Sequence, residues 1–213
     1  MITLALDTST ARGSVAVWAR GELVFQQTFV ADRSHSATLF ATLERARSEI
    51  PKLDQVAVGL GPGSYAGIRI SIAAALGLEI GLGAKLVGIP SVAALEVESP
   101  RYLAVGDARR GAFYFSAVEN GVCLEGPKIA TEEEVREAVG RFGAWPLYTC
   151  ESIEPFSTAE VVLPSAAILG SLAEDGRGIV QAGNLEPIYL REPYITQPKS
   201  RHGLPPQGGF VLE

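Results

Sequence analysis

The chain has 213 residues, of which 47% are hydrophobic and 20% are charged, and its formal net charge is −6. This balance is typical of a globular protein with one large or two small cores, and it argues against a disordered chain. An acidic chain lacks the basic footprint of a nucleic-acid-binding protein, so a role involving RNA requires a partner that supplies positive surface.

Cysteine usage and the apolar runs indicate the compartment. Cys123 and Cys150 are far apart and form no C-x-x-C motif, which favours reduced thiols in a cytosol. The N-terminus reaches Asp7 before an apolar signal region can form. The most apolar run, residues 70–84, contains Glu79 and is shorter than the roughly 20 residues that a bilayer span needs. We therefore expect a cytoplasmic protein without membrane contact.

The first half of the chain is predicted to alternate between strands and helices. In chain order we expect three strands, a helix, a strand, a helix, a strand and a short helix, at residues 2–7, 14–20, 22–30, 35–50, 54–60, 67–83, 85–89 and 91–97. The helix at 35–50 is marked by apolar residues at spacings of three and four, and Pro51 ends it.

The second half repeats this order. A strand at 101–107 ends in an acidic residue, as the strand at 2–7 does, and a second strand follows at 112–118. Asn120-Gly121 is a strong hairpin signal into a third strand. A capping box, Thr131 to Glu134, opens a helix that we expect Gly140 to close.

A repeat of about 100 residues predicts two duplicated lobes and not a solenoid. Two βββα lobes around a cleft are the plan of the actin-like/sugar-kinase (ASKHA, RNase H-like) α/β fold. We expect an N-terminal RNase H-like lobe at 1–100, a C-terminal lobe at 101–195 and a disordered tail at 196–213. The alternative is a single mixed sheet whose halves resemble each other by chance.

The turn after the first strand has two interpretations. Its residues are Asp7, Thr8, Ser9 and Thr10. Hydroxyls and N–H groups in such a turn can cradle a phosphate while the acid holds Mg²⁺ through water, or the side chains can bond their own backbone. Asp107 takes the equivalent place in the second half, but the next three residues lack hydroxyls. The second half of the chain therefore lacks the phosphate-binding hydroxyls that a nucleotide site between the two halves needs.

A glycine-rich turn at residues 61–69 follows one predicted strand and opens a helix. Its sequence is Gly61-Pro62-Gly63-Ser64-Tyr65-Ala66-Gly67-Ile68-Arg69. It lacks the Lys-Ser/Thr pair of a P-loop, the acid that a dinucleotide site needs after the next strand, and the first glycine of a nucleophile elbow. What remains is a tight turn with N–H groups that face outward at a helix N-terminus.

The helix at 67–83 is apolar on every face, with Arg69 and Glu79 as its charged residues. A helix of this kind must be covered on all sides, and one small lobe is not large enough to cover it. Gly77 and Gly81 permit a close backbone approach. We therefore expect a protein–protein interface here, with ordinary helix–sheet packing as the alternative.

The sequence offers little for metal or acid–base chemistry. The two histidines, His35 and His202, form no pair on a helix face, so a transition-metal site is not expected. His35 is interpreted as a helix-start or interface residue, Arg109 and Arg110 as a solvated turn, and the cysteines as core residues.

Five motifs together resemble the bacterial TsaB (YeaZ) family. They are Leu6 to Thr10, Arg33-Ser34-His35, Gly61 to Arg69, Asp107-Ala108-Arg109 with Gly111, and Pro187 to Arg191. The resemblance runs from Met1 to about Arg191 and is most specific at Gly61 to Arg69. Tyr65-Ala66 stands where the family usually has Phe-Thr, and residues 145–168 match only in outline.

The resemblance implies a two-lobed actin-like protein that has lost nucleotide hydrolysis and metal binding. It implies a non-catalytic scaffold or activator that pairs with the catalytic subunit TsaD and works with the ATPase TsaE. Together these proteins form N6-threonylcarbamoyladenosine at position 37 of tRNA, which the chain contacts indirectly. No catalytic residue and no cofactor is expected, and weak nucleotide binding at the Asp7 turn stays open.

The pairing surface implied by the resemblance lies on the helices at 35–50 and 67–83, which also form a homodimer when the protein is alone. The candidate interface residues are His35, Leu39, Phe40, Leu43, Ile72, Leu76 and Ile80. Two alternatives remain: a small ATPase or kinase that uses Asp7 and Asp107 with Mg²⁺, and a homodimeric binding module unrelated to tRNA.

Overall fold

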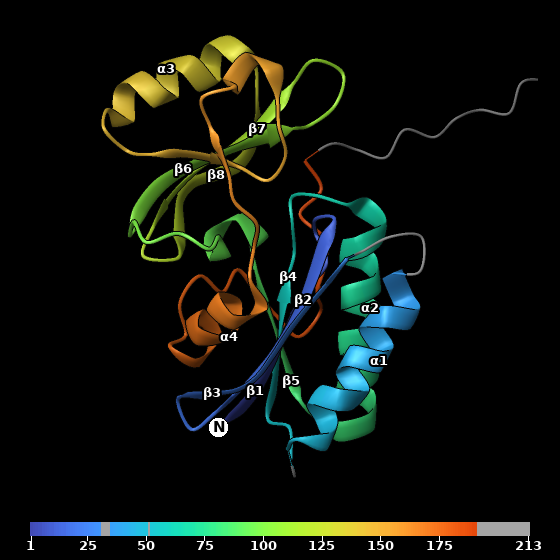
Figure 1. Cartoon of the computed structure of the whole chain (residues 1–213). Helices are drawn as coiled ribbons and strands as arrows, with labels where there is room; N and C mark the ends of the chain where they lie inside the picture. Colours follow the sequence, from blue (N-terminus) through green and yellow to red (C-terminus); the bar gives the residue numbers. More distant parts are fainter. Residues whose placement is uncertain (31–34, 51, 191–213) are drawn as a thin grey trace, which may run out of the picture.

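The computed structural model describes residues 1–30, 35–50 and 52–190, and it contains two mixed sheets, one above the other in Figure 1. The first sheet has the strand order β11-β5-β4-β1-β2-β3 and the second has the order β10-β9-β6-β7-β8. The first sheet consists of β1 (Ile2–Asp7), β2 (Arg12–Ala19), β3 (Glu22–Val30), β4 (Gln55–Gly59), β5 (Lys85–Ile89) and β11 (Gln181–Ala182). The second consists of β6 (Arg101–Asp107), β7 (Phe113–Glu119), β8 (Val122–Ala130), β9 (Leu147–Thr149) and β10 (Glu160–Val161).

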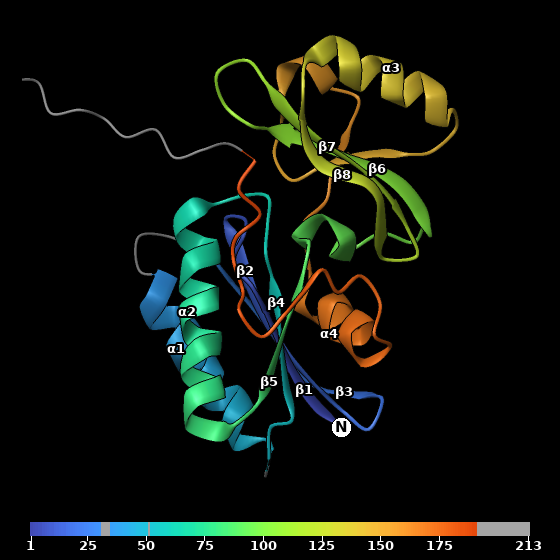
Figure 2. The same cartoon turned by 180° about the vertical axis from the view of Figure 1, so that it is seen from behind.

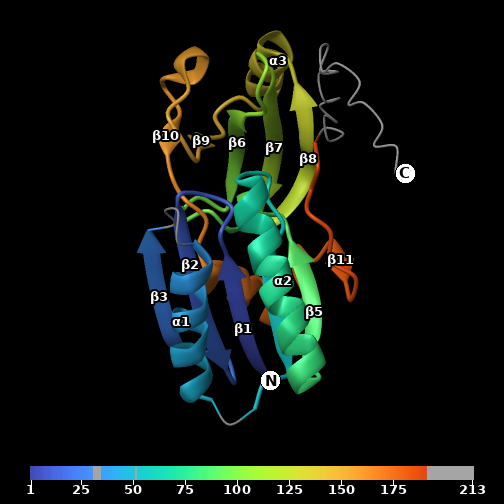
Figure 3. The same cartoon turned by 90° about the vertical axis from the view of Figure 1, so that its right-hand side faces the viewer.

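The helices cover the sheets unequally. α1 (His35–Ser48) and α2 (Tyr65–Leu82) lie side by side on one face of the first sheet, as Figures 2 and 3 show, and α4 (Ala166–Glu174) lies on the opposite face. α3 (Glu132–Phe142) packs on the second sheet. Two short 3₁₀ turns complete the described chain, η1 (Ser91–Ala94) and η2 (Glu154–Phe156).

The predicted duplication is present in the strand pairing. β1 pairs antiparallel with β2 and parallel with β4, and β6 makes the same two pairings with β7 and β9. In both sheets the third strand leads into a helix, α1 or α3, and the fifth strand pairs parallel with the fourth. The predicted α/β fold with duplicated βββα lobes is therefore confirmed.

The two lobes differ most between their fourth and fifth strands. The first lobe carries α2 there, a helix of 18 residues, whereas the second carries η2, a turn of three residues. The long apolar helix thus has no counterpart in the second lobe.

The end of the described chain packs on the first sheet, which favours a different division into lobes from the predicted one. α4 packs on β1 and β2, and β11 pairs antiparallel with β5 in the first sheet. Residues 166–182, predicted as part of a C-terminal lobe at 101–195, therefore return to the first sheet. We propose that the first lobe comprises 1–100 with this returning segment. The predicted tail at 196–213 lies outside the described residues.

The start of a helix was predicted correctly where the sequence contains a capping box. Other helix boundaries, and one whole helix, were not. The capping box at Thr131 and Glu134 opens α3 as predicted, but Gly140 lies inside that helix, which ends at Gly143 (φ 63°). The helix expected at 91–97 is only the 3₁₀ turn η1. α4 was not predicted, because Ser165 makes no side-chain cap and no charged residue marks its first turn.

Three apolar clusters hold the elements together. The first lies between the first sheet and the α1–α2 layer, and the third lies between the second sheet and α3. The second cluster joins the lobes, since Ala5 and Val92 from the first lobe and Tyr102 and Tyr114 from the second belong to it, together with α4. The Tyr102 hydroxyl also donates to the Val92 carbonyl at 2.8 Å. The lobes therefore share one core on the α4 side.

The packing of α4 on the first sheet gives a first prediction. A Cβ at Gly170 would lie 2.5 Å from Trp18 Cδ1, and the Trp18 indole is fixed by its bond to the Ala167 carbonyl. We expect Gly170→Ala to lower the free energy of unfolding by about 1–2 kcal/mol, because overpacking outweighs the gain in helix propensity.

The matched control is Gly140→Ala in α3, where a new Cβ meets nothing within 4 Å. Alanine should raise the free energy of unfolding there by about 0.5–1 kcal/mol. Urea unfolding of both variants checks the pair, and equal effects at the two positions would contradict the docking of α4.

Candidate functional site

The Asp7 carboxylate is the centre of the predicted phosphate turn, and it is only 1% exposed. Its Oδ1 accepts hydrogen bonds from the Ser9 N–H at 2.8 Å and from the Ser9 hydroxyl at 2.7 Å. Its Oδ2 accepts from the Ser91 hydroxyl at 2.6 Å, and the Ser91 Oγ in turn accepts from the Gly61 N–H at 2.9 Å. The carboxylate thus joins the end of β1, η1 and the glycine-rich turn.

The hydroxyl groups of this turn are also bonded within the chain. Thr8 Oγ1 donates to the Gly67 carbonyl at 2.6 Å and lies 2.6 Å from Ser71 Oγ. Thr10 Oγ1 donates to the Arg12 carbonyl at 3.0 Å and accepts from the Arg12 N–H at 3.3 Å. Of the two interpretations of this turn, the geometry favours the one in which it bonds its own chain.

The glycine-rich turn opens α2 as predicted, but its donors do not all face outward. Ser64 is the N-cap of α2, and its Oγ accepts from the Gly67 N–H at 3.2 Å. The Ser64 N–H donates to the Ser9 carbonyl at 2.6 Å. Two N–H groups expected to be free for an anion are therefore bonded inside the chain.

Two glycines of this motif are explained by close packing. A Cβ at Gly67 would lie 1.9 Å from the Thr8 carbonyl oxygen, and one at Gly63 would lie 2.1 Å from the Ser9 carbonyl oxygen. Both contacts are with backbone, which cannot rotate away as a side chain can. The motif thus allows the first turn of α2 to lie directly against the turn after β1.

Arg69 connects α2 to the last described segment. Its guanidinium carbon lies 4.3 Å from the centroid of the Tyr65 ring, and its Nε donates to the Tyr189 hydroxyl at 2.9 Å. This hydrogen bond raises the pKa of the Arg69 guanidinium. The Ile188 N–H donates to the Leu60 carbonyl at 2.9 Å. The residues at 187–190 are thereby held against the start of α2, a contact that the sequence did not reveal.

A cleft of about 650 Å³ lies between the lobes. Its lining includes Ser9 and Thr10 from the first lobe and Asp107 and Arg109 from the second, so the two equivalent turns meet as the repeat predicted. The Asp7 carboxylate is not part of the lining. Asp107 Oδ2 lies 2.9 Å from Arg109 Nη1, and its Oδ1 accepts from the Arg109 N–H at 2.6 Å. Neither acid therefore presents an unpaired carboxylate to the cleft.

The thiol in the cleft lining is not activated. Burial raises the pKa of Cys150 to about 12, against the opposing effect of its bond with Tyr114. Burial likewise raises the pKa of Cys123 to about 12. Thiols of this kind stay protonated near neutral pH and are poor nucleophiles. In residues 1–30, 35–50 and 52–190, no three His, Cys, Asp or Glu side chains gather closely enough to hold a metal ion.

The outer face of α2 is largely apolar, and no other part of the described chain covers it. Ile80 is 85% exposed and Leu76 is 36% exposed, and on neighbouring α1 Phe40 is 52% exposed. Cβ atoms at Gly77 and Gly81 would meet nothing within 4 Å. Among the described helices, α2 alone has the length and apolar composition of a membrane span, with a third of its residues buried.

Three of the predicted interface residues face inward. Leu39, Leu43 and Ile72 are buried in the cluster between the first sheet and the α1–α2 layer, so they are core residues. The helical spacing identified the apolar residues correctly but did not separate the inner face from the outer. The side chain of His35 lies outside the described part of the chain.

The glycine contacts give a second prediction, which uses two glycines of the same helix. Gly67→Ala should lower the free energy of unfolding by about 2 kcal/mol or more, because the new methyl group meets the Thr8 carbonyl. Gly77→Ala should raise it by about 0.5–1 kcal/mol, because the position is open. Thermal unfolding at a concentration that keeps the chain monomeric measures both. A neutral Gly67→Ala would contradict the close approach.

The duplicated lobes, their strand order and the cleft between them define a two-lobed actin-like protein. Comparison with known proteins narrows this class. The family model described as "TsaD: tRNA N6-adenosine threonylcarbamoyltransferase" matches residues 29–141. The Escherichia coli (strain K12) protein named tRNA threonylcarbamoyladenosine biosynthesis protein TsaB is 28% identical, over 90% of this chain and 95% of its own.

Two further relatives agree with this match. An uncharacterised protein of Mycobacterium tuberculosis (strain ATCC 25618 / H37Rv) is 30% identical, over 89% of this chain and 92% of its own. A Pseudomonas aeruginosa crystal structure described as similar to peptidase YEAZ has a TM-score of 0.73 and 27% identity, over 89% of this chain and 99% of its own. The chain belongs to the TsaB (YeaZ) family, as the five motifs predicted.

Proposed function

We propose that this chain is a non-catalytic scaffold and activator subunit in the formation of N6-threonylcarbamoyladenosine at position 37 of tRNA. It pairs with a catalytic subunit of the TsaD class through the outer face of α2. The pathway is suggested by the name of the E. coli relative, and the pairing rests on the uncovered apolar face of that helix.

The outer face of α2 has the chemistry of a helix-packing surface. Leu76 and Ile80 supply exposed apolar area, while Gly77 and Gly81 leave open space beside them for a partner backbone. Large apolar side chains clustered on one exposed helix face mark an interaction site. We call the surface formed by Leu76, Gly77, Ile80 and Gly81 the α2 face. Phe40 on adjacent α1 is exposed as well.

The site geometry supports an accessory role and not a catalytic one. A phosphotransferase needs an acid that holds Mg²⁺ and donors that cradle phosphate. In this chain both oxygens of the Asp7 carboxylate accept hydrogen bonds from the protein, and the Thr8, Ser9 and Thr10 hydroxyls are bonded internally. We therefore assign the chain neither a metal nor a cofactor.

The remaining assignments follow from charge and surface. A net charge of −6 favours contact with tRNA through the partner and not directly. An ATPase of the TsaE class completes the proposed assembly in the cytoplasm. The same α2 face forms a homodimer when the partner is absent, since an uncovered apolar helix favours self-association.

The third prediction tests the pairing. Ile80→Glu adds a charge at a position that is 85% exposed, so the fold should tolerate it while the apolar contact is lost. We expect the variant to lose co-elution with a TsaD-class subunit and to lower reconstituted tRNA modification by at least tenfold. Size-exclusion chromatography and nucleoside analysis of the tRNA provide the two measurements.

The matched control is Leu124→Glu, which adds the same charge at an exposed apolar residue of β8 in the second lobe. It should bind and activate as the parent chain does. Full activity of Ile80→Glu would contradict the assigned surface. Nucleotide turnover by the isolated chain would contradict the non-catalytic role itself.

A further inference from the structure

Within residues 52–190 the chain passes between the lobes twice, and the two crossings pair with each other. The first crossing follows η1 at Leu95 and Glu96, and the second runs through Leu163 to Ser165 before α4. Leu95 and Pro164 form an antiparallel bridge. The Ser165 N–H donates to the Ala94 carbonyl at 2.9 Å, and the Glu96 N–H donates to the Leu163 carbonyl at 3.2 Å. The connection between the lobes is thus a short two-stranded ribbon.

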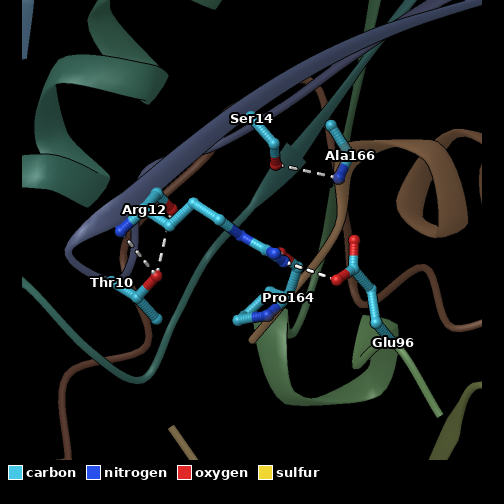
Figure 4. A network of polar contacts seen from close by, with 6 residues as sticks. All are labelled: Thr10, Arg12, Ser14, Glu96, Pro164 and Ala166. Atoms are coloured by element: carbon cyan, nitrogen blue, oxygen red, sulfur yellow. Dashed lines mark hydrogen bonds and ion pairs between the residues drawn. The ribbon is translucent and has the colours of Figure 1, made fainter. Parts of the chain in front are cut away.

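One side chain from the first sheet contacts both crossings, as Figure 4 shows. Arg12 stands at the start of β2, and its Nη2 donates to Glu96 Oε2 at 2.8 Å and to the Pro164 carbonyl at 3.2 Å. Two residues along the same strand, Ser14 Oγ accepts from the Ala166 N–H at 2.9 Å. Side chains of β2 therefore form hydrogen bonds with both crossings and with the first residue of α4.

The Arg12 guanidinium is not fully satisfied in this arrangement. Its Nε is buried and has no hydrogen-bond partner among the described residues, while Nη2 donates to two acceptors. A buried N–H without a partner is unfavourable, and guanidinium–carboxylate pairs are strongest when two parallel bonds form. Glu96 lies on the first crossing, so the Arg12–Glu96 pair joins that crossing to β2.

Arg12 is also connected to the cleft, through its backbone and Thr10. Thr10 lines the cleft and exchanges two hydrogen bonds with the Arg12 backbone. We propose that Arg12 fixes the angle between the lobes, and with it the width of the cleft, because its side chain holds both crossings to β2. We call its contacts with Glu96 and Pro164 the Arg12 latch. The shared core that contains Tyr102 forms the pivot, and release of the Arg12–Glu96 pair frees the ribbon.

The experiment combines residue-resolved hydrogen exchange with a distance measurement. In Arg12→Met we expect the Glu96, Ser165 and Ala166 amides to exchange at least tenfold faster, while amides of β1 and β4 keep their protection. Spin labels at Lys85→Cys and Glu133→Cys, one exposed position in each lobe, report the angle. This pair is placed in a chain with Cys123→Ala and Cys150→Ala. The distance distribution should broaden or shift by several ångströms in the latch variant.

Glu96→Gln is a milder second variant that keeps the fold if Arg12→Met does not. Arg12→Met and Glu96→Gln both remove the Arg12–Glu96 ion pair. Their effects on the exchange rates of the crossing amides should therefore not add in the double variant. Arg141→Met, which breaks an ion pair with Glu125 inside the second lobe, should leave crossing exchange and the interlobe distance unchanged. Unchanged crossing exchange in both latch variants, or an equal acceleration in all strands, would overturn the proposal.

Discussion

The site depends on the hydrogen bonds that the buried Asp7 carboxylate accepts. A carboxylate that is removed from water must accept hydrogen bonds from the protein, and Asp7 receives them from Ser9 and from Ser91. These bonds draw the turn after β1, the glycine-rich turn and η1 to one point. The Ser9 carbonyl then accepts from the Ser64 N–H, which sets the start of α2. In this chain the acid at the end of the first strand connects the elements that position α2.

The two faces of α2 differ in their surroundings, and the proposed partner surface rests on this difference. The second lobe has η2 at the equivalent place and not a long helix. The inner residues of α2, including Ile68 and Ile72, fill the core against the sheet, and its outer residues are exposed within the described structure. Because the first turn of α2 is bonded to the turn after β1, the helix presents this outer face as a rigid surface. The Arg12 latch adds a separate control, since it acts on the angle between the lobes.

Much of the fold was readable from the sequence, for identifiable reasons. The strands β5 and β6 match their predicted ranges, because each is a short apolar run bounded by turn or capping residues. The motif at 61–69 and the exposed Ile80 were also identified. Long-range contacts were not: Ser91 and Tyr189 act through bonds to residues far away in the chain, and periodicity carries no information about them. The inward orientation of Ile72 was missed for a related reason, since α2 is apolar on every face and its sequence does not show which face meets the sheet.

The most direct test of the account is a methyl NMR titration of the isotopically labelled chain with a TsaD-class subunit. The Ile80 and Leu76 methyl signals should shift or broaden when one equivalent of the partner subunit has been added. The methyl signals of Leu39 and Ile72, which lie in the core beneath, should keep their positions. Unchanged Ile80 and Leu76 signals, with the response elsewhere on the molecule, would contradict the assignment of the α2 face as the surface through which this protein acts.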